Sequence, residues 1–294
     1  MSRAPLAEPV PHSAGTRLPR QALPTGACDA HMHIFDKRFA PSPHWPRKPP
    51  QADVATYRQL QQRIGTQRTI VVTPSTFGVD NSCTVDALDQ LGASARGVAV
   101  VDAEVSEAEL GRLATRRVRG LRVNFVSPQS WGVTTPKMLE TLARKAAQLS
   151  WHIQVFAQPE QLVAMESLLA SLPTPLIIDH LGLIDPADGA GGVGFDTLRR
   201  LLDRGRTWVK LSGIYMRSRN GAPGYADTFP LGLALVRHAP ERLVWGSDWP
   251  HTTEAPGSVD DADLVDVLLA WCGQDATLRQ VLVDNPARLY GFDS

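Results

Sequence analysis

The chain has 294 residues, of which 43% are hydrophobic and 20% are charged, and its 30 Lys and Arg residues balance its 30 Asp and Glu residues. A net charge of zero gives no basic footprint for nucleic acid or an anionic membrane, and no apolar stretch approaches the ~20 residues of a membrane span. The cysteines Cys28, Cys83 and Cys272 are odd in number and widely spaced. This pattern argues against a disulfide framework and predicts a reducing, cytoplasmic location.

Residues 1–25 are rich in proline and lack the apolar core of a signal peptide. We interpret them as an N-terminal arm that is either packed on the surface or disordered. Neither an internal repeat nor a second composition regime follows, so residues 26–294 are predicted to form a single domain.

Eight short apolar segments alternate with amphipathic segments along that domain. The predicted strands are Ala27–Phe35, Thr69–Val72, Gly97–Val101, Gly120–Phe125, His152–Phe156, Leu176–Asp179, Trp208–Leu211 and Leu243–Gly246. The predicted helices are Val54–Ile64, Asn81–Leu91, Glu107–Arg117, Pro136–Leu149, Pro159–Leu169, Asp196–Asp203, Thr228–His238, Asp260–Trp271 and Ala276–Val283. Continuously apolar strands are typical of a parallel sheet that is covered on both faces. Eight strand–helix units in series predict the α/β class and a (β/α)8 barrel of the TIM type.

Long connections follow several of the predicted strands and precede helices. They are Asp36–Asp53, Ser127–Thr135, Gly182–Gly194, Ser212–Asp227 and Trp249–Asp260. In a barrel such loops belong to the face at the carboxyl ends of the strands, where active sites lie.

Four candidate catalytic residues stand at strand ends on that face. His31 and His33 are two residues apart on one strand, so both imidazoles should point to the same side. His180 follows the sixth strand and Asp248 follows the eighth. Asp248 is the only carboxylate in this set, so we predict that it activates water as a general base. The three histidines are predicted to polarise the carbonyl group and stabilise the oxyanion that forms from it.

Five motifs carry a resemblance to a known superfamily. They are D-A-H-M-H at 29–33, D-H-L-G at 179–182, W-V-K-L-S-G at 208–213, W-G-S-D-W-P-H at 245–251 and D-N-P-A-R-L-Y at 284–290. Over residues 26–291 the chain resembles the amidohydrolase superfamily, and within it the branch of 2-pyrone-4,6-dicarboxylate lactonase and related lactone hydrolases. The resemblance implies a barrel hydrolase that opens the ester bond of a small anionic lactone.

The resemblance also bears on metal binding. Metal-dependent members of the superfamily usually add a histidine at the end of the fifth strand, but Phe156 stands there. His152 lies four residues earlier, roughly 13 Å below the catalytic rim. Because the resembling lactonases work without a divalent metal, no cofactor is predicted to be required. The alternative is one zinc ion with three protein ligands, and these would be His31, His33 and Asp248.

A second set of residues is predicted to bind the substrate: Ser75, Arg122, Asn124, Tyr215, Arg217 and His251. Arginine suits bidentate capture of a carboxylate or sulfonate. Arg122 lies within a strand that carries no Asp or Glu, so the substrate's anion is its expected partner. Arg217 is expected to assist, whereas Arg219 in the same loop could equally be solvated.

The chain departs from the pyrone dicarboxylate lactonase pattern where a second carboxylate would bind. Ser127 and Pro128 replace a basic pair, Leu183 replaces an arginine and Phe156 replaces a tyrosine. A lactone with one strong anion, such as a muconolactone-like or sugar-acid lactone, therefore fits better than the pyrone dicarboxylate, and catabolism of aromatic compounds is the expected setting. The rival functions are a metal-dependent decarboxylase, a lactone isomerase and a catalytically inactive binding protein. The retained Asp248 favours hydrolysis over these rival functions. The sequence is compatible with a homo-oligomer.

Overall fold

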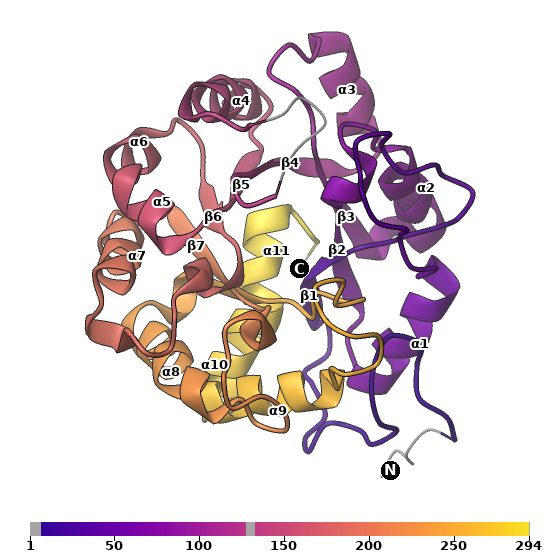
Figure 1. Cartoon of the computed structure of the whole chain (residues 1–294), viewed down its shortest axis with the longest axis vertical. Coiled ribbons are helices and arrows are strands. Elements are labelled where there is room, and N and C mark those ends of the chain that lie inside the picture. The colour runs from indigo at the N-terminus through magenta and orange to yellow at the C-terminus, as the bar shows by residue number, and fades with distance from the viewer. Residues whose placement is uncertain (1–6, 128–132, 294) are drawn as a thin grey trace.

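The computed structural model describes residues 7–127 and 133–293, and within them eight parallel strands form one sheet in sequence order (Figure 1). The strands are β1 (Cys28–Met32), β2 (Arg68–Val72), β3 (Ala95–Ala99), β4 (Val118–Asn124), β5 (His152–Phe156), β6 (Leu176–Ile178), β7 (Thr207–Leu211) and β8 (Leu243–Trp245). Backbone hydrogen bonds join the two ends of the sheet: Asp248 donates to the carbonyl of His31 at 2.8 Å, and His33 donates to that of Trp249 at 2.9 Å. The predicted (β/α)8 barrel is therefore confirmed.

Helices α1 to α9 surround the barrel in the order of the chain, whereas α11 lies inside this ring in the view of Figure 1. The helices are α1 (Val54–Ile64), α2 (Ser82–Leu91), α3 (Glu107–Thr115), α4 (Pro136–Gln148), α5 (Pro159–Ala164), α6 (Glu166–Ser171), α7 (Val193–Asp203), α8 (Phe229–His238), α9 (Asp261–Cys272), α10 (Asp275–Arg279) and α11 (Asn285–Tyr290). Among the described residues, no helix has the length and apolar character needed to cross a bilayer.

Several predicted elements differ from the observed ones by one to three residues at an end, and three differ for a reason that the structure shows. The first strand ends at Met32 rather than Phe35, because its register shifts after Asp29 and Phe35 instead forms an antiparallel bridge with Ala52. The predicted helix Pro159–Leu169 is two helices that meet at Met165, where the backbone leaves helical geometry. The last predicted helix continues through a π turn into α11, because Pro286 lacks the N–H that would continue the α-helical ladder.

The N-terminal arm packs on the barrel from residue 7 onward. Trp249 donates through Nε1 to the carbonyl of Pro11 at 3.0 Å, and Ala14 donates to that of Val259 at 2.7 Å. Arg17 forms an ion pair with Asp266 in α9 at 2.7 Å. Residues 1–6 of the predicted arm and 128–132 of the predicted loop after β4 lie outside the described residues. The division into an arm and one barrel domain remains a prediction.

The lower part of the barrel is closed by the C-terminal segment. The ring of Tyr290 in α11 lies edge-on to His152 at 5.2 Å between centroids. A Cβ atom at Gly120 on the neighbouring strand would lie 2.1 Å from Nε2 of His152, so only glycine leaves room for that ring. His152 is therefore part of the packed interior, at the opposite end of β5 from Phe156, as predicted.

Candidate active site

The structure brings the four predicted catalytic residues together at the carboxyl ends of the strands. Nε2 of His31 lies 3.3 Å from Nε2 of His33 and 3.5 Å from Oδ1 of Asp248. Nε2 of His33 lies 3.4 Å from the same carboxylate oxygen. The rings of His31 and His180 are 4.7 Å apart between centroids. All four side chains are buried.

Backbone geometry at two strand ends turns these side chains inward. His180 has a φ of 52° and Asp248 a φ of 60°, in the left-handed region that non-glycine residues seldom occupy. Such conformations persist where surrounding contacts fix them, and they cluster at functional sites. Asp248 is fixed by the hydroxyl of Tyr215, which donates to Oδ2 at 2.6 Å. His180 is fixed by a hydrogen bond between Nδ1 and the hydroxyl oxygen of Ser212, at 2.9 Å.

A second group of charged and polar side chains lies below the histidines inside the barrel. Nζ of Lys210 is 3.1 Å from Nδ1 of His31 and donates to Oε1 of Gln154 at 2.7 Å. Asp179 accepts from Nε of Arg122 at 3.1 Å and from Nε2 of Gln154 at 3.0 Å. We refer to Arg122, Gln154, Asp179 and Lys210 as the buried charged layer.

This layer corrects two sequence interpretations. Arg122 on β4 has a carboxylate partner in the protein, namely Asp179. Asp179 follows β6, and β5 lies between these two strands in the sheet. Asp248 is also not the only carboxylate near the histidines, since Oδ1 of Asp179 lies 3.4 Å from Nδ1 of His31. The sequence held a signal for both, because the acidic residue Asp179 directly follows the apolar strand β6.

Burial and charge set the ionisation of the site. Burial, and then the neighbouring Lys210, lower the pKa of His31, so this imidazole is neutral. Burial also lowers the pKa of Lys210, to about 8, which leaves it mainly protonated at neutral pH. Burial alone would raise the pKa of Asp248, but interactions with His180 and His33 outweigh it and hold that pKa below its usual value. Asp248 is thus a carboxylate at neutral pH.

The predicted substrate-binding residues fall into two groups. Ser75, Arg122 and Asn124 line one cavity together with His33, His180 and Asp248, so Arg122 reaches from the buried charged layer to the cavity wall. Nδ2 of Asn124 donates to the hydroxyl of Ser75 at 2.9 Å. Tyr215 and Arg217 do not line this cavity.

Tyr215 and His251 instead form a hydrogen-bonded chain behind Asp248. Nδ1 of His251 lies 3.2 Å from the hydroxyl of Tyr215, and Nε2 lies 3.1 Å from Oδ2 of Asp261. Arg217 turns away from the cavity and donates to Oε1 of Gln158. The direct substrate contacts predicted for Tyr215 and Arg217 therefore have no support in this geometry, whereas His251 lines a cavity that adjoins the candidate site.

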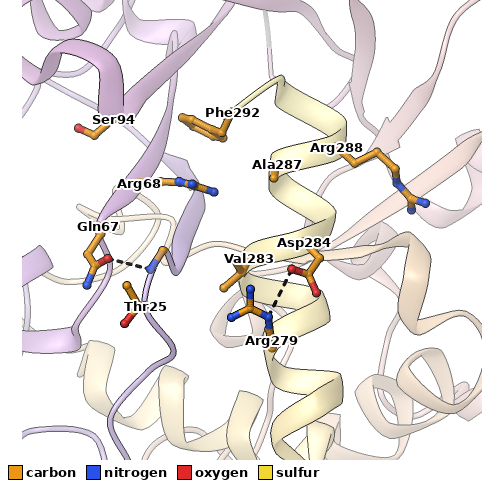
Figure 2. Close-up of a pocket in the computed structure, with 11 residues that line it drawn as sticks. Thr25, Gln67, Arg68, Ser94, Arg279, Val283, Asp284, Ala287, Arg288 and Phe292 are labelled. Atoms are coloured by element: carbon orange, nitrogen blue, oxygen red, sulfur yellow. Dashed lines mark hydrogen bonds and ion pairs between the residues drawn. The ribbon is translucent and has the colours of Figure 1, made fainter. Parts of the chain in front are cut away.

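A larger cavity, of about 860 Å³, lies at the opposite end of the barrel beside α11 (Figure 2). It is lined by Arg68, Arg279 and Arg288 among others, but by none of the predicted site residues. We place the candidate active site in the smaller cavity, because chemistry depends on converging reactive groups rather than on volume.

The fold and the site define a barrel enzyme whose reactive histidines and aspartates stand at the carboxyl ends of the strands. The chain belongs to the amidohydrolase family, whose model matches residues 28–292. The predicted class of hydrolase is therefore confirmed.

Three curated relatives cover about nine tenths of the chain. The 4-sulfomuconolactone hydrolase of Rhizobium radiobacter is 35% identical over 92% of this chain and 91% of its own length. The 2-pyrone-4,6-dicarboxylate hydrolase of Comamonas testosteroni is 33% identical over 92% of both chains. The D-galactarolactone isomerase of Agrobacterium fabrum is 30% identical over 92% of this chain and 93% of its own length. Among solved structures, an apo protein of Agrobacterium tumefaciens is 29% identical with a TM-score of 0.85, covering 94% of this chain and 99% of its own.

Proposed function

We propose that this enzyme hydrolyses the ester bond of a small anionic lactone, with Asp248 as the general base. The observation that carries the proposal is the convergence of one carboxylate oxygen of Asp248 with Nε2 of His31 and of His33, at 3.5 and 3.4 Å. A carboxylate in the wall of the cavity can accept a proton from a water molecule that attacks the carbonyl. The names of the three relatives, all lactone-acting enzymes, support a cyclic ester as the substrate.

Lys210 explains how His31 can serve as a hydrogen-bond donor. An ammonium group only donates, so its contact with Nδ1 makes that nitrogen the acceptor. The single proton of the neutral ring then lies on Nε2, which faces Asp248. In this tautomer His31 can donate to the oxygen of the carbonyl as it becomes anionic, and a donor fixed in a buried site contributes most to such a step.

The same residues also fit one divalent metal ion. The three atoms Nε2 of His31, Nε2 of His33 and Oδ1 of Asp248 are 3.3 to 3.5 Å apart, close to the edge of a tetrahedron whose centre lies about 2.0–2.1 Å from each ligand. A bound zinc ion would polarise the carbonyl and lower the pKa of a water molecule.

We nevertheless propose that no metal is required. Ligation through Nε2 would need the proton of His31 on Nδ1, where Lys210 lies closer than the carboxylate of Asp179, at 3.1 against 3.4 Å. The end of β5 offers Phe156 rather than a further ligand. Both features support catalysis by the protein's own groups.

A lactone isomerase is the second candidate, because one relative carries that name. An isomerase must exclude water while the acyl group moves between hydroxyls, whereas the proposed role of Asp248 is to activate water. A metal-dependent decarboxylase is disfavoured, because the Lys210 contact with His31 and Phe156 at the end of β5 both argue against a bound metal.

The proposed activity is tested with a panel of anionic lactones at neutral pH, in which ring opening is followed by proton release. Carrying out the reaction in H₂¹⁸O separates the candidates, since hydrolysis incorporates one ¹⁸O atom into the product and isomerisation incorporates none. Absence of proton release with muconolactone-like, pyrone carboxylate and sugar-acid lactones would contradict the proposal.

We further propose that the enzyme acts in the cytoplasm, in the catabolism of aromatic or sugar acids. All three cysteines are buried free thiols, which agrees with a reducing compartment.

A further inference from the structure

The loop between β1 and α1 contributes two residues to the mouth of the candidate active site. Trp45 and Arg47 line the catalytic cavity, of about 80 Å³, and also an adjoining cavity of about 270 Å³. The two cavities share these residues with Thr76 and Thr252. Because small-molecule sites usually measure about 300–1,000 Å³, a substituted lactone must extend from the inner cavity past Trp45 and Arg47 into the outer one.

Arg47 carries a charge that is not paired with any acidic side chain in residues 7–127 and 133–293. Its side chain is exposed and stacks over the ring of Trp45, with the guanidinium carbon 5.2 Å from the centroid. Among the described residues, it makes no hydrogen bond or ion pair. By contrast, Arg122 is held by Asp179 at 3.1 Å and Arg217 is held by Gln158 outside the cavity. Among the described residues that line the cavity, Arg47 is thus the arginine whose guanidinium makes no hydrogen bond or ion pair with the protein, whereas that of Arg122 pairs with Asp179 through Nε.

The loop is held in place at several points. Phe35 and Ala52 exchange backbone hydrogen bonds at 2.9 and 2.8 Å, which ties the two ends of the loop together. Ser42 donates to the carbonyl of Thr76 at 2.8 Å, beside the cavity. Five prolines, at 41, 43, 46, 49 and 50, restrict the backbone further. Binding an anion at a loop that is already fixed loses less conformational entropy than ordering a flexible one.

We propose that Arg47, stacked on Trp45, binds the carboxylate or sulfonate of the substrate at the junction of the two cavities. The inference rests on the proposed lactonase function and names its specificity residue. A guanidinium can donate two parallel hydrogen bonds to either anion, and stacking on the indole ring fixes its orientation. The lactone ring then lies in the inner cavity, over His33 and Asp248, with its anionic substituent directed outward.

The test compares Arg47→Gln with Lys37→Gln, which makes the same change of charge in the same loop at a residue that lines neither cavity. The substrates are (5-oxotetrahydrofuran-2-yl)acetate, its sulfonate analogue and its neutral primary amide. Loss of a charge-assisted hydrogen bond predicts a fall of about 10- to 100-fold in kcat/KM for both anionic lactones, with the neutral amide unaffected. Lys37→Gln should behave as the wild type. Arg47→Lys should lie between the two, since lysine keeps the charge but loses the paired hydrogen bonds.

Calorimetry with 3-oxocyclopentaneacetate, a ring ketone that cannot be hydrolysed, tests the same contact without turnover. Arg47→Gln should weaken its binding about 10- to 100-fold relative to the wild type and leave binding of its methyl ester unchanged. If the wild type binds the ketone acid through Arg47 but opens no lactone, the proposed reaction fails while the anion site stands. If the wild type binds acid and ester equally, or if Lys37→Gln weakens binding as much as Arg47→Gln, the proposal for Arg47 is wrong.

Discussion

Nζ of Lys210 lies 3.1 Å from Nδ1 of His31, and both groups are fully buried in the centre of the barrel. This contact connects a residue deep in β7 with the catalytic rim. When Nδ1 of His31 accepts a hydrogen bond from the lysine, the single proton of the neutral ring lies on Nε2. In the proposed mechanism, Lys210 thereby determines whether Nε2 of His31 can donate a hydrogen bond to the substrate.

We expect Lys210→Met to lower kcat about 10- to 100-fold with little change in KM, since a mispositioned proton weakens transition-state stabilisation more than ground-state binding. The ¹⁵N chemical shifts of His31 should change from those of a ring protonated at Nε2, which a purely structural role of Lys210 would not produce. Lys137→Met on the exposed surface of α4 is the control. An unchanged kcat together with an unchanged His31 tautomer would contradict the prediction.

Asp248→Asn should lower kcat by at least ~10², the contribution typical of general-base catalysis, and leave the circular dichroism spectrum unchanged. The amide keeps the volume of the carboxyl group but cannot take a proton from water. Asp188→Asn in the exposed loop before α7 should have no effect. A variant that retains full kcat on a lactone hydrolysed by the wild type would exclude Asp248 as the base.

Extensive chelation should leave most of the activity, because the Lys210 contact favours the His31 tautomer that donates rather than ligates. Elemental analysis before and after dialysis against a chelator, with assays in metal-free buffer, provides the measurement. One zinc ion per chain, with activity that disappears on its removal and returns on its addition, would show that His31, His33 and Asp248 are metal ligands instead.

The sequence predicted the barrel and the histidines and aspartate at its strand ends more successfully than the contacts of the buried charged layer. Helix α1 has the bounds that the sequence predicted. In the structure, Asp53 accepts a hydrogen bond from the backbone N–H of Thr56 at one end, and Gly65 adopts a φ of 92° at the other. Both are local signals of a helix cap.

The contact between Arg122 and Asp179 depends instead on the register of three strands, which no local pattern specifies. Arg47 presents the same difficulty, since its position over the cavity follows from how a proline-rich loop folds back on η1 (Ser75–Phe77).

Arg122→Met should affect stability more than substrate choice. The substitution leaves the carboxylate of Asp179 buried with one fewer partner, and breaking a buried pair in this way typically costs about 3–5 kcal/mol. Urea denaturation should show the loss, while the preference for anionic over neutral lactones should persist. If stability is unchanged and that preference disappears, the substrate rather than Asp179 is the main partner of Arg122.

His152 should make the stability of the protein depend on pH. Its ring is fully buried beside Tyr290, and among the described residues neither ring nitrogen has a hydrogen-bond partner. Burial therefore lowers its pKa to about 3 from the ordinary value of 6.5.

Between pH 3 and 6.5 the unfolded chain binds a proton at His152 that the folded chain does not bind, so the free energy of unfolding must rise with pH across this range. One such group contributes a slope of at most about 1.4 kcal/mol per pH unit. We expect His152→Leu to flatten the dependence of urea midpoints on pH in that window, whereas His44→Gln in the exposed loop after β1 should keep the wild-type slope. Because both variants are compared with the wild type at each pH, the change in slope is independent of any constant packing effect of the substitution. Equal slopes in all three proteins would mean that His152 titrates alike in the folded and unfolded chains, and would contradict its place in the closed interior of the barrel.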